Sequence, residues 1–460
     1  MIPHVSRPWR AAAVAACALL AGCAQLSPDA GFAQVEQTSH QRLGQTPAWN
    51  RTPEQAQASS ERVRQLLQAP SGTPRLASAD DAVQIALINN PDLQGEFAAL
   101  GVAEADLVQA GRLPNPGLSF ARTHAGDDIK IERSLSLGLM RLLTLPAASR
   151  IEQRRFEQVR LSLAARVLAV AAQTRQAYYQ AVAAQQGLQY QEQVADAAGA
   201  AHELAAQMTR LGNISQLDGA REQLFYGQAQ ASLQQARRLA AQHKETLARL
   251  LGLAPDFALP GQLPALPRQL DELGDVEQQA LQQRLDVQAA RAELEGLQGS
   301  LGLTRATRWV NVLDLGALRT SESGKPPETG YEISLEIPLF DWGEARVAKA
   351  EAIYLQGAHK LAGAILDARA QARQAWRERQ DAYTLARRYQ DQWLPLRQRI
   401  AEENLLRYNG MLISVFALLA DAREQAATVN AAIEAQRDFW IADASLQQAL
   451  GGRPQQGKQP

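Results

Sequence analysis

The stretch YEISLEIPLFDWG, residues 331–343, decides the fold because its periodicity changes halfway along. In the first half, apolar side chains alternate with polar ones, which is typical of a strand with one apolar face. Pro338 cannot donate to a strand ladder and should end the strand, while Asp341 and Gly343 indicate a helix start. An Ala-, Gln-, Arg- and Glu-rich segment follows over about 344–408. A short strand therefore leads into a very long helix.

The same arrangement occurs earlier in the chain. Alternating patterns predict strands at about 117–123, 129–139, 309–318 and 331–339. A second Ala-rich segment, about 147–211, has apolar residues spaced by threes and fours, as in coiled coils. Each strand pair is therefore expected to lead into a long helix.

The chain repeats itself. Equivalent segments are 90–93 and 284–287, 145–150 and 339–346, 210–212 and 407–410, and 220–223 and 422–425, with displacements of 194, 196, 197 to 198, and 202. The last step predicts that the second helix reversal is longer by roughly one turn. Each half should contain helix, strand, strand, long helix and returning helix. We expect a first repeat at 79–252, a connector at 253–275, a second repeat at 276–451 and a tail at 452–460.

The N-terminus has the pattern of a secreted lipoprotein. Arg7 and Arg10 precede an apolar run of about ten residues, which is too short to cross a bilayer as a helix. Leu-Ala-Gly-Cys, ending at Cys23, resembles a bacterial lipobox, so we expect a signal peptide at 1–22 and a lipid on Cys23. An ordinary signal peptide with a nearby cysteine is the alternative. Ala24 follows the cysteine at the position where an aspartate would typically signal retention at the inner membrane, so the resemblance favours the outer membrane. The polar, proline-rich segment 23–78 is interpreted as a lipidated arm.

Composition and spacing argue against several function classes. The net charge is -1, and Lys and Arg are scattered among Glu and Asp, so no nucleic-acid partner is expected. The histidines stand apart, without metal-ligand spacing, and the glycines form no phosphate-binding loop. We therefore expect no enzyme activity, no cofactor and no metal site. Only one cysteine would remain after signal-peptide cleavage, which excludes an internal disulfide.

Strands of about ten residues are long enough to cross a bilayer when tilted, but four strands cannot close a useful barrel. Because open sheet edges are not tolerated in lipid, the strands should close through identical copies around an axis. The apolar faces would then contact lipid. Lys130, Glu132, Glu332 and Glu336 lie on the opposite face and are expected to line a wet lumen.

These features resemble the TolC family of outer-membrane efflux proteins along nearly all of the mature chain. The resemblance rests on the lipobox, NNPDLQ, the duplicated unit, IPLFDWGEARVAKAEA, and the reversals RLGNISQLDGAREQL and RYNGMLISVFALLADAREQA. It implies a mainly α fold with a small transmembrane β part. The homotrimer would form a 12-stranded β-barrel continued by a long α-helical coiled-coil barrel. It also implies a lipid-anchored outer-membrane location extending into the periplasm, with a periplasmic adaptor and an inner-membrane transporter as partners.

By the same resemblance, the helix reversals form a periplasmic tip that closes the resting channel. The tip residues carried over are Arg210, Gly212, Asn213, Ser215, Asp218, Arg407, Tyr408, Gly410, Ser414, Phe416, Leu419 and Asp421. Phe416 and Leu419 occupy pore-facing places and would form an apolar constriction, or else pack between helices. Arg407 and Tyr408 would bond across to the neighbouring hairpin or cap helix carbonyls.

The resemblance makes the protein a passive duct for small solutes, either metal ions or drugs. RLGNISQLDGAREQ is somewhat closer to the metal group, although the chain's four methionines form no thioether ladder. Two alternatives stay open: the outer duct of a type I protein secretion system, and a lipid-anchored helical scaffold that forms no pore.

Overall fold

The structure, a computed structural model, describes residues 25–67, 72 and 74–453. The expected signal peptide, the lipidation residue Cys23 and tail residues 454–460 lie outside these residues. The chain divides into two compact units. Of the described residues, unit 1 contains 25–33, 97–162 and 286–365, and unit 2 contains the rest, from 34–96, 163–285 and 366–453. We describe each unit by itself.

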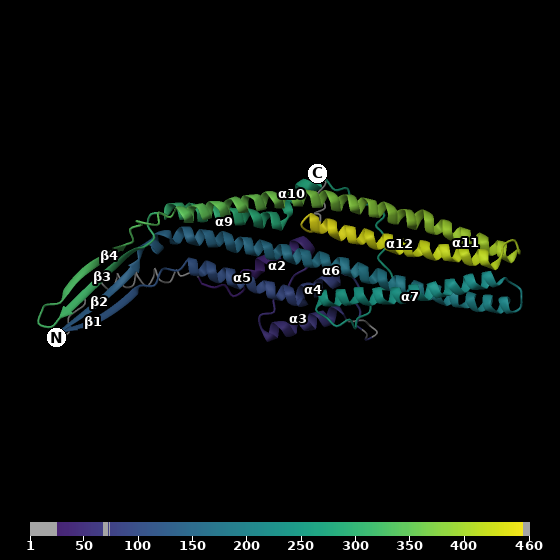
Figure 1. The fold of residues 1–460 in the computed structure, drawn as a ribbon, viewed down its shortest axis with the longest axis horizontal. Helices are drawn as coiled ribbons and strands as arrows, with labels where there is room; N and C mark the ends of the chain where they lie inside the picture. Colours follow the sequence, from purple (N-terminus) through teal and green to yellow (C-terminus); the bar gives the residue numbers. More distant parts are fainter. Residues whose placement is uncertain (1–24, 68–71, 73, 454–460) are drawn as a thin grey trace. The chain divides into compact units, whose positions relative to one another are not determined.

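The fold is mainly helical with one small antiparallel sheet, as the sequence predicts (Figure 1). The helices are α2 (Phe32–Leu43), α3 (Pro53–Leu66), α4 (Ala79–Asn89), α5 (Pro91–Ala110), α6 (Leu139–Arg210), α7 (Gln216–Leu251), α8 (Val276–Gln283), α9 (Leu285–Ala306), α10 (Glu344–Arg388), α11 (Leu394–Asn409) and α12 (Val415–Ala449). The strands are β1 (Gly117–Ala125), β2 (Asp128–Gly138), β3 (Leu313–Glu322) and β4 (Glu328–Leu335). Two helices, two strands, a long helix and a returning helix occur twice in this order.

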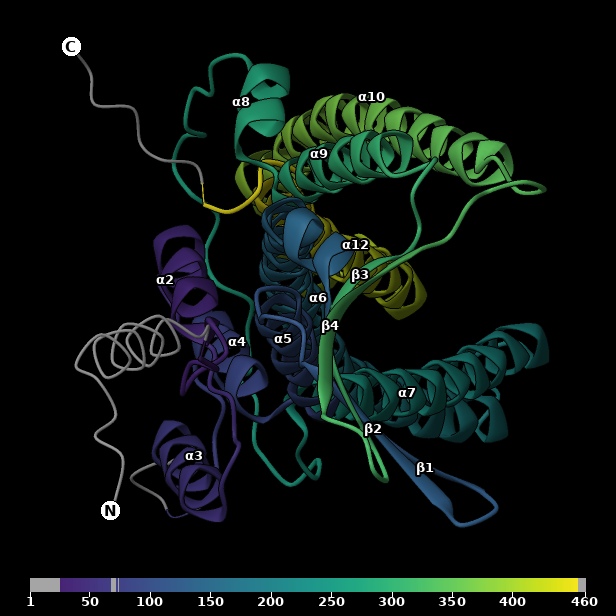
Figure 2. The same cartoon turned by 90° about the vertical axis from the view of Figure 1, so that its left-hand side faces the viewer.

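In unit 1 the strands form a single sheet in chain order, β1-β2-β3-β4, with antiparallel neighbours. The two views show α9 beside the first part of α10 (Figures 1 and 2). Their contact is close because a Cβ on Gly357 would come within 2.6 Å of the Leu297 side chain. The ion pairs Lys360–Glu293 (2.7 Å) and Arg305–Glu351 (2.6 Å) join the exposed edges of the two helices.

Two strands of the second pair are shifted from their predicted positions. The strand expected at 309–318 runs from Leu313 to Glu322, because the turn that follows α9 occupies residues 307–312. The amide of Thr307 still donates to the carbonyl of Leu303 (2.9 Å), as in a helix. The strand expected at 331–339 runs from Glu328 to Leu335, so it ends before Pro338.

The first strand-to-helix junction also differs from the prediction. The strand expected at 129–139 ends at Gly138, and α6 begins at Leu139 rather than after Pro146. Pro146 therefore lies inside α6, where it removes one amide donor from the helix. The resulting α6 contains 72 residues. The alternating apolar residues before the proline are compatible with either structure, so periodicity alone placed the boundary late.

The second long helix is interrupted, whereas the sequence predicts continuous helix over about 344–408. A π-helical turn, Tyr389–Trp393, separates α10 from α11. Pro395 follows as the second residue of α11 and has no amide hydrogen to donate to the preceding turn. Because a missing donor in the hydrogen-bond ladder is a common cause of such turns, we attribute the interruption to this proline.

Unit 2 has the main apolar core, which contains α3, α4, α7, part of α6 and the connector around Phe257. The Asn89-Asn90 pair explains how α4, α5 and α7 meet there. The Asn90 side-chain amide donates to the carbonyl of Leu250 (2.9 Å), and its oxygen accepts from the amide of Leu93 (2.9 Å). One asparagine thus caps the end of α7 and the start of α5. The proline-rich segment interpreted as an arm contains two helices, α2 and α3.

Candidate functional site

The sheet register in unit 1 separates apolar from polar side chains. Leu118 of β1 pairs with Leu135 of β2, which pairs with Ala317 of β3, which in turn pairs with Tyr331 of β4. Since paired residues lie on the same face, these four side chains share one face. Seven of its large apolar members are exposed, namely Leu118, Phe120, Leu135, Leu315, Tyr331, Ile333 and Leu335. Ile129, Ile131, Leu137 and Leu313 on the same face are half-buried. No other part of the described chain therefore covers this face.

The opposite face holds the residues expected to line a lumen. Lys130 and Glu132 are two residues apart on β2 and therefore share a face. Glu132 pairs with Thr320 of β3, and Glu332 of β4 pairs with Gly316 of β3, so Glu332 lies on this face as well. Lys130 and Glu132 form an ion pair of 2.5 Å along β2. Glu336 lies just beyond β4, where its amide donates to the carbonyl of Val312 (3.3 Å) and extends the ladder. This face is polar and exposed, so it is suited to contact with water.

The PLFDWG junction is built around a tight backbone approach. Gly343 has φ 71°, and a Cβ there would lie 2.7 Å from the carbonyl oxygen of Arg308. The Asp341 carboxylate accepts from the Gly343 amide (2.8 Å) just before α10 begins. Trp342 packs edge-on against Trp309, with ring centroids 5.6 Å apart. Glycine is required at this position because any side chain would collide with the backbone of Arg308.

In unit 2, the first helix reversal has the geometry that its sequence predicts. Gly212 has φ 76°, and the Asn213 amide donates to the carbonyl of Met208 (2.9 Å), as in a Schellman motif. The Ser215 hydroxyl accepts from the amide of Asp218 (3.1 Å) and donates to its carboxylate (2.7 Å). A glycine and a capping serine thus close one helix and start the next.

The second reversal uses a different residue for the left-handed position. Gly410, which the repeat aligns with Gly212, has φ -79°, whereas Met411 has φ 58°. The Leu412 amide donates to the carbonyl of Arg407 (2.8 Å), which is the bond that Asn213 makes in the first reversal. Met411 is therefore the structural counterpart of the first glycine. Its side chain is almost fully exposed, so the unfavourable φ is not offset by burial.

The two reversals have the same length. Arg210 ends α6, five residues separate it from α7, and five residues separate α11 from α12. The capping serines Ser215 and Ser414 are 199 residues apart, as are the two left-handed residues. The predicted lengthening of the second reversal is therefore wrong. The extra residues lie inside α12, because Arg221 follows its cap by six positions and Arg423 follows its cap by nine.

The remaining tip residues lie near the ends of α11 and α12. Arg407 forms an ion pair with Glu403 (3.3 Å), one turn earlier on its own helix. Tyr408 is exposed, and its carbonyl accepts from the amide of the left-handed methionine (2.9 Å). Phe416 and Leu419 are half-buried in the first turns of α12. These positions are compatible with both a constriction and helix packing.

An ion pair that the sequence does not reveal joins α7 to α12. Arg423 Nη2 donates to Glu222 Oε1 (2.7 Å), and the guanidinium lies 4.0 Å from the ring centroid of Phe225. The Glu222 side chain is only 3% exposed. Neither its second oxygen nor Arg423 Nε has a hydrogen-bond partner in the described chain.

Asp421 pairs with α11. Arg397 Nη1 donates to Asp421 (3.3 Å), and Arg397 Nη2 donates to Glu424 (3.0 Å). The arginine therefore bridges two carboxylates one turn apart on α12. This contact and the Arg423 pair hold three helices together behind the reversals.

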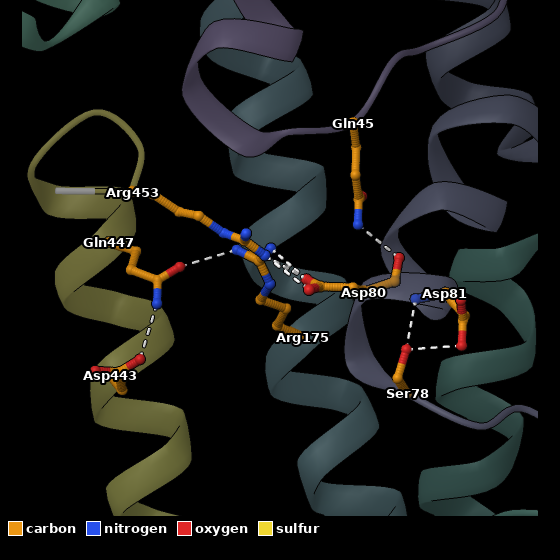
Figure 3. Close-up of polar contacts among 8 residues, drawn as sticks. All are labelled: Gln45, Ser78, Asp80, Asp81, Arg175, Asp443, Gln447 and Arg453. Atoms are coloured by element: carbon orange, nitrogen blue, oxygen red, sulfur yellow. Dashed lines mark hydrogen bonds and ion pairs between the residues drawn. The ribbon is translucent and has the colours of Figure 1, made fainter. Parts of the chain in front are cut away.

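Figure 3 shows a second polar cluster in unit 2, centred on Asp80 at the start of α4. Arg175 Nη2 donates to Asp80 (2.8 Å), and Arg453 Nη2 donates to both carboxylate oxygens (2.7 Å each). Arg175 also donates to Gln447 of α12 (2.9 Å). Burial acts to raise the pKa of Asp80, but hydrogen bonds from the two arginines outweigh it and hold the pKa below its usual value. The cluster ties α4 to α6 and to the end of the second repeat.

A groove of about 270 Å³ lies between α6, α7 and α12 in unit 2. It is lined largely by polar side chains, including Gln191, His243, Asn430, Glu434 and Arg437. Burial and the nearby Arg437 lower the pKa of His243, which favours the neutral imidazole. Its openness and mixed lining suit a helix-packing groove rather than a closed catalytic pocket.

Among the described residues, no helix combines the length and apolar character needed to cross a membrane. No group of three or more His, Cys, Asp and Glu side chains among these residues is placed to hold a metal ion.

The chain matches no protein-family model. It is 26% identical over 280 residues to the cobalt-zinc-cadmium resistance protein CzcC of Cupriavidus metallidurans, a match that covers 58% of this chain and 65% of the relative. It is 28% identical over 290 residues to protein CyaE of Bordetella pertussis, covering 57% of this chain and 60% of the relative. The chain thus spans less than two thirds of the length of each curated relative.

Solved structures resemble the chain over more of its length. The outer-membrane protein VceC of Vibrio cholerae is 17% identical, with a TM-score of 0.68 and coverage of 81% of this chain and 96% of its own. The open state of the MtrE outer-membrane channel of Neisseria gonorrhoeae is 19% identical, with a TM-score of 0.67 and coverage of 81% and 89%. At these identities the likeness establishes the fold.

Proposed function

The chain has the fold of the TolC family of outer-membrane channels, and from that premise we propose that it is the outer-membrane duct of a tripartite efflux system. In this role it passively carries small solutes from an inner-membrane pump and a periplasmic adaptor to the exterior. The observation that carries the proposal is the sheet, whose apolar face is uncovered and whose other face holds the strand carboxylates.

The edges of this sheet support the proposed trimer and barrel. β1 and β4 are its edge strands, and each presents backbone groups on its outer side that no other strand of the described residues pairs with. Unpaired backbone groups are strongly unfavourable in lipid, so closure requires further copies. Three copies supply 12 strands, with the apolar face toward lipid and Lys130, Glu132, Glu332 and Glu336 toward the lumen. The long helices then continue the barrel into the periplasm.

We assign the two reversals to the periplasmic tip. Leu211, Met411 and Leu412 are large apolar residues that stand exposed at these turns. They offer an apolar surface on which the adaptor docks. Phe416 and Leu419, just inside the second turn, form an apolar constriction that closes the resting channel by dewetting. The competing assignment packs these two side chains between helices.

Metal ions are the favoured substrate class, with drugs as the second. The support is the similarity to CzcC, a cobalt-zinc-cadmium resistance protein. The described residues contain no cluster that could hold a metal. Selectivity therefore belongs to the pump, and the duct only conducts. Cys23 would carry a lipid anchor, on the strength of the Leu-Ala-Gly-Cys sequence.

The experiment is expression of the full chain in a bacterium, followed by membrane fractionation and planar-bilayer recording. We expect heat-resistant trimers in the outer-membrane fraction that conduct ions, and a Cys23→Ser variant that loses the lipid mass but still forms trimers. Monomers released from membranes by mild salt, without conductance, would overturn the proposal.

A further inference from the structure

The charged residues of the sheet are sorted between its faces. The register places all six strand carboxylates on the polar face, and they are Asp128, Glu132, Asp314, Glu322, Glu328 and Glu332. The other face carries three arginines among its apolar residues, Arg122, Arg133 and Arg319. Chance alternation does not account for a division in which every strand carboxylate lies away from every strand arginine.

The three arginines lie together. Arg133 and Arg319 are direct register partners on neighbouring strands. Arg122 pairs with Ile131, two residues from Arg133 on the same face. Directly opposed like charges repel, and no carboxylate of the described chain forms an ion pair with any of the three. All three side chains are exposed. The patch is therefore cationic and lacks a counter-charge within the described chain.

The three arginines also lie at one position along the strands, between the hairpin turns and the apolar rows. Toward the hairpin turns, the face is mixed, because Ile131 lies between Arg122 and Ser321 and Ile129 pairs with His124 in the next row. Away from the turns it becomes apolar, through Leu135, Ala317 and Tyr331 in the next row. The apolar rows reach Leu335, six residues below the arginine row on β4, or about 20 Å of strand at ~3.3 Å per residue. The arginines thus mark the upper edge of a band with roughly the height of a thin bilayer core.

We propose that Arg122, Arg133 and Arg319 form a binding site for the phosphate of an anionic lipid headgroup at the outer rim of the membrane. This inference rests on the membrane position of the sheet proposed above. Guanidinium groups bind phosphate oxygens through paired hydrogen bonds, and an anion between Arg133 and Arg319 would offset their mutual repulsion. Long arginine stems can lie on the apolar band while their heads reach the headgroup layer.

The test uses the full chain in vesicles of equal phosphatidylglycerol and phosphatidylcholine. Trimers are extracted in mild detergent, and bound lipids are counted by native mass spectrometry. We expect the wild type to retain phosphatidylglycerol over phosphatidylcholine by at least about threefold, and the preference to fall with salt. The triple variant Arg122→Gln, Arg133→Gln, Arg319→Gln should retain the two lipids about equally. The matched control Lys130→Gln, on the opposite face of β2, should keep the wild-type preference.

If the triple variant does not insert, Arg133→Gln alone replaces it, with Arg133→Lys as the charge-preserving comparison. An unchanged preference in the glutamine variants overturns the site. Loss of bound phosphatidylglycerol on adding millimolar inorganic phosphate at constant ionic strength would assign the patch to free anions instead. A wild type that inserts and conducts without lipid preference defeats this inference alone, whereas failure to insert defeats the proposed channel as well.

Discussion

Arg423 on α12 donates to Glu222 on α7 at 2.7 Å, and the Glu222 side chain is buried behind the helix reversals. Removing one partner of a buried pair leaves the other charge uncompensated, which costs about 3–5 kcal/mol when both are buried. Because the Arg423 side chain is 31% exposed, we expect a smaller loss for Glu222→Ala, on the order of 2 kcal/mol.

The measurement is thermal or denaturant unfolding of the trimer. The double variant Glu222→Leu, Arg423→Met should recover most of the stability, because it removes both charges. Arg221→Gln serves as the control, since its pair with Asp218 is exposed and such pairs contribute about 0–1 kcal/mol. A Glu222→Ala protein as stable as the control would show that the pair is not important for stability.

Met411→Gly should stabilise the second reversal. A left-handed conformation costs a non-glycine residue roughly 1–2 kcal/mol, while glycine adds about 0.5–1 kcal/mol of unfolded-state entropy. The net expected gain is therefore a few tenths of a kcal/mol to about 1 kcal/mol in the free energy of unfolding. The matched change in the first reversal, Gly212→Ala, should lower stability by about 1 kcal/mol. Equal effects of the same sign would contradict the left-handed assignment.

Ile333→Arg should block assembly in the outer membrane. This side chain is exposed on the apolar face, and an arginine facing lipid near mid-depth costs about 2–4 kcal/mol. Ser334→Asp changes the adjacent residue on the polar face and should assemble normally. The readout is the fraction of heat-resistant trimer in the membrane. Normal trimer formation by Ile333→Arg would reverse our assignment of the two faces.

Phe416→Ala should increase leak through the closed channel if this side chain forms the constriction. Single-channel recording at low voltage measures the closed-state current, and we expect a several-fold increase because a wider apolar neck no longer dewets. Leu406→Ala, at an exposed position of α11, is the control and should leave the current unchanged. An unaltered leak in Phe416→Ala, in trimers of normal stability, would favour packing between helices.

Acid should weaken the Asp80 cluster. The folded-state pKa of Asp80 lies below its unfolded value, so its charged contacts stabilise the protein above the unfolded pKa, near 4. That contribution is lost as the pH falls through the lower folded pKa. Between pH 5 and about pH 3, the melting temperature of the wild type should fall more than that of Asp80→Asn. Asp271→Asn, an exposed control, should keep the wild-type slope.

Alternation and helix periodicity predicted the mainly helical fold, the four strands and their polar side. Residues such as Lys130 and Glu332 could be placed on one face because strand period is two, independent of where the strand ends. The start of β3 was predicted too early, because the turn that follows α9 contains apolar residues such as Val310 and Val312, which do not distinguish it from a strand. Pro146 was interpreted as a boundary, although a proline in the first turns of a long helix can be accommodated.

Long-range pairs were beyond sequence reasoning. Arg453 and Asp80 are 373 residues apart, and nothing local distinguishes them from other exposed charges. Met411 was missed for a different reason: Gly410 stands next to it, and glycine is the usual left-handed residue at a helix end. Only the backbone dihedral angles reveal that the methionine takes the position instead.

The sequence Ala-Arg-Glu-Gln occurs at 220–223 in α7 and at 422–425 in α12. In α12, three additional residues separate it from the capping residue Ser414, so the same four residues face different neighbours in the two helices. At about 100° per residue, three residues rotate the motif by roughly 300° around the helix axis, equivalent to about 60° in the opposite sense. Arg221 consequently points into solvent near its own helix cap, whereas Arg423 points toward α7. Because of this rotation, Arg423 of the second hairpin faces Glu222 of the first, whereas the equivalent Arg221 does not face the second hairpin. The two hairpins therefore bind each other through residues that are not equivalent in the repeat.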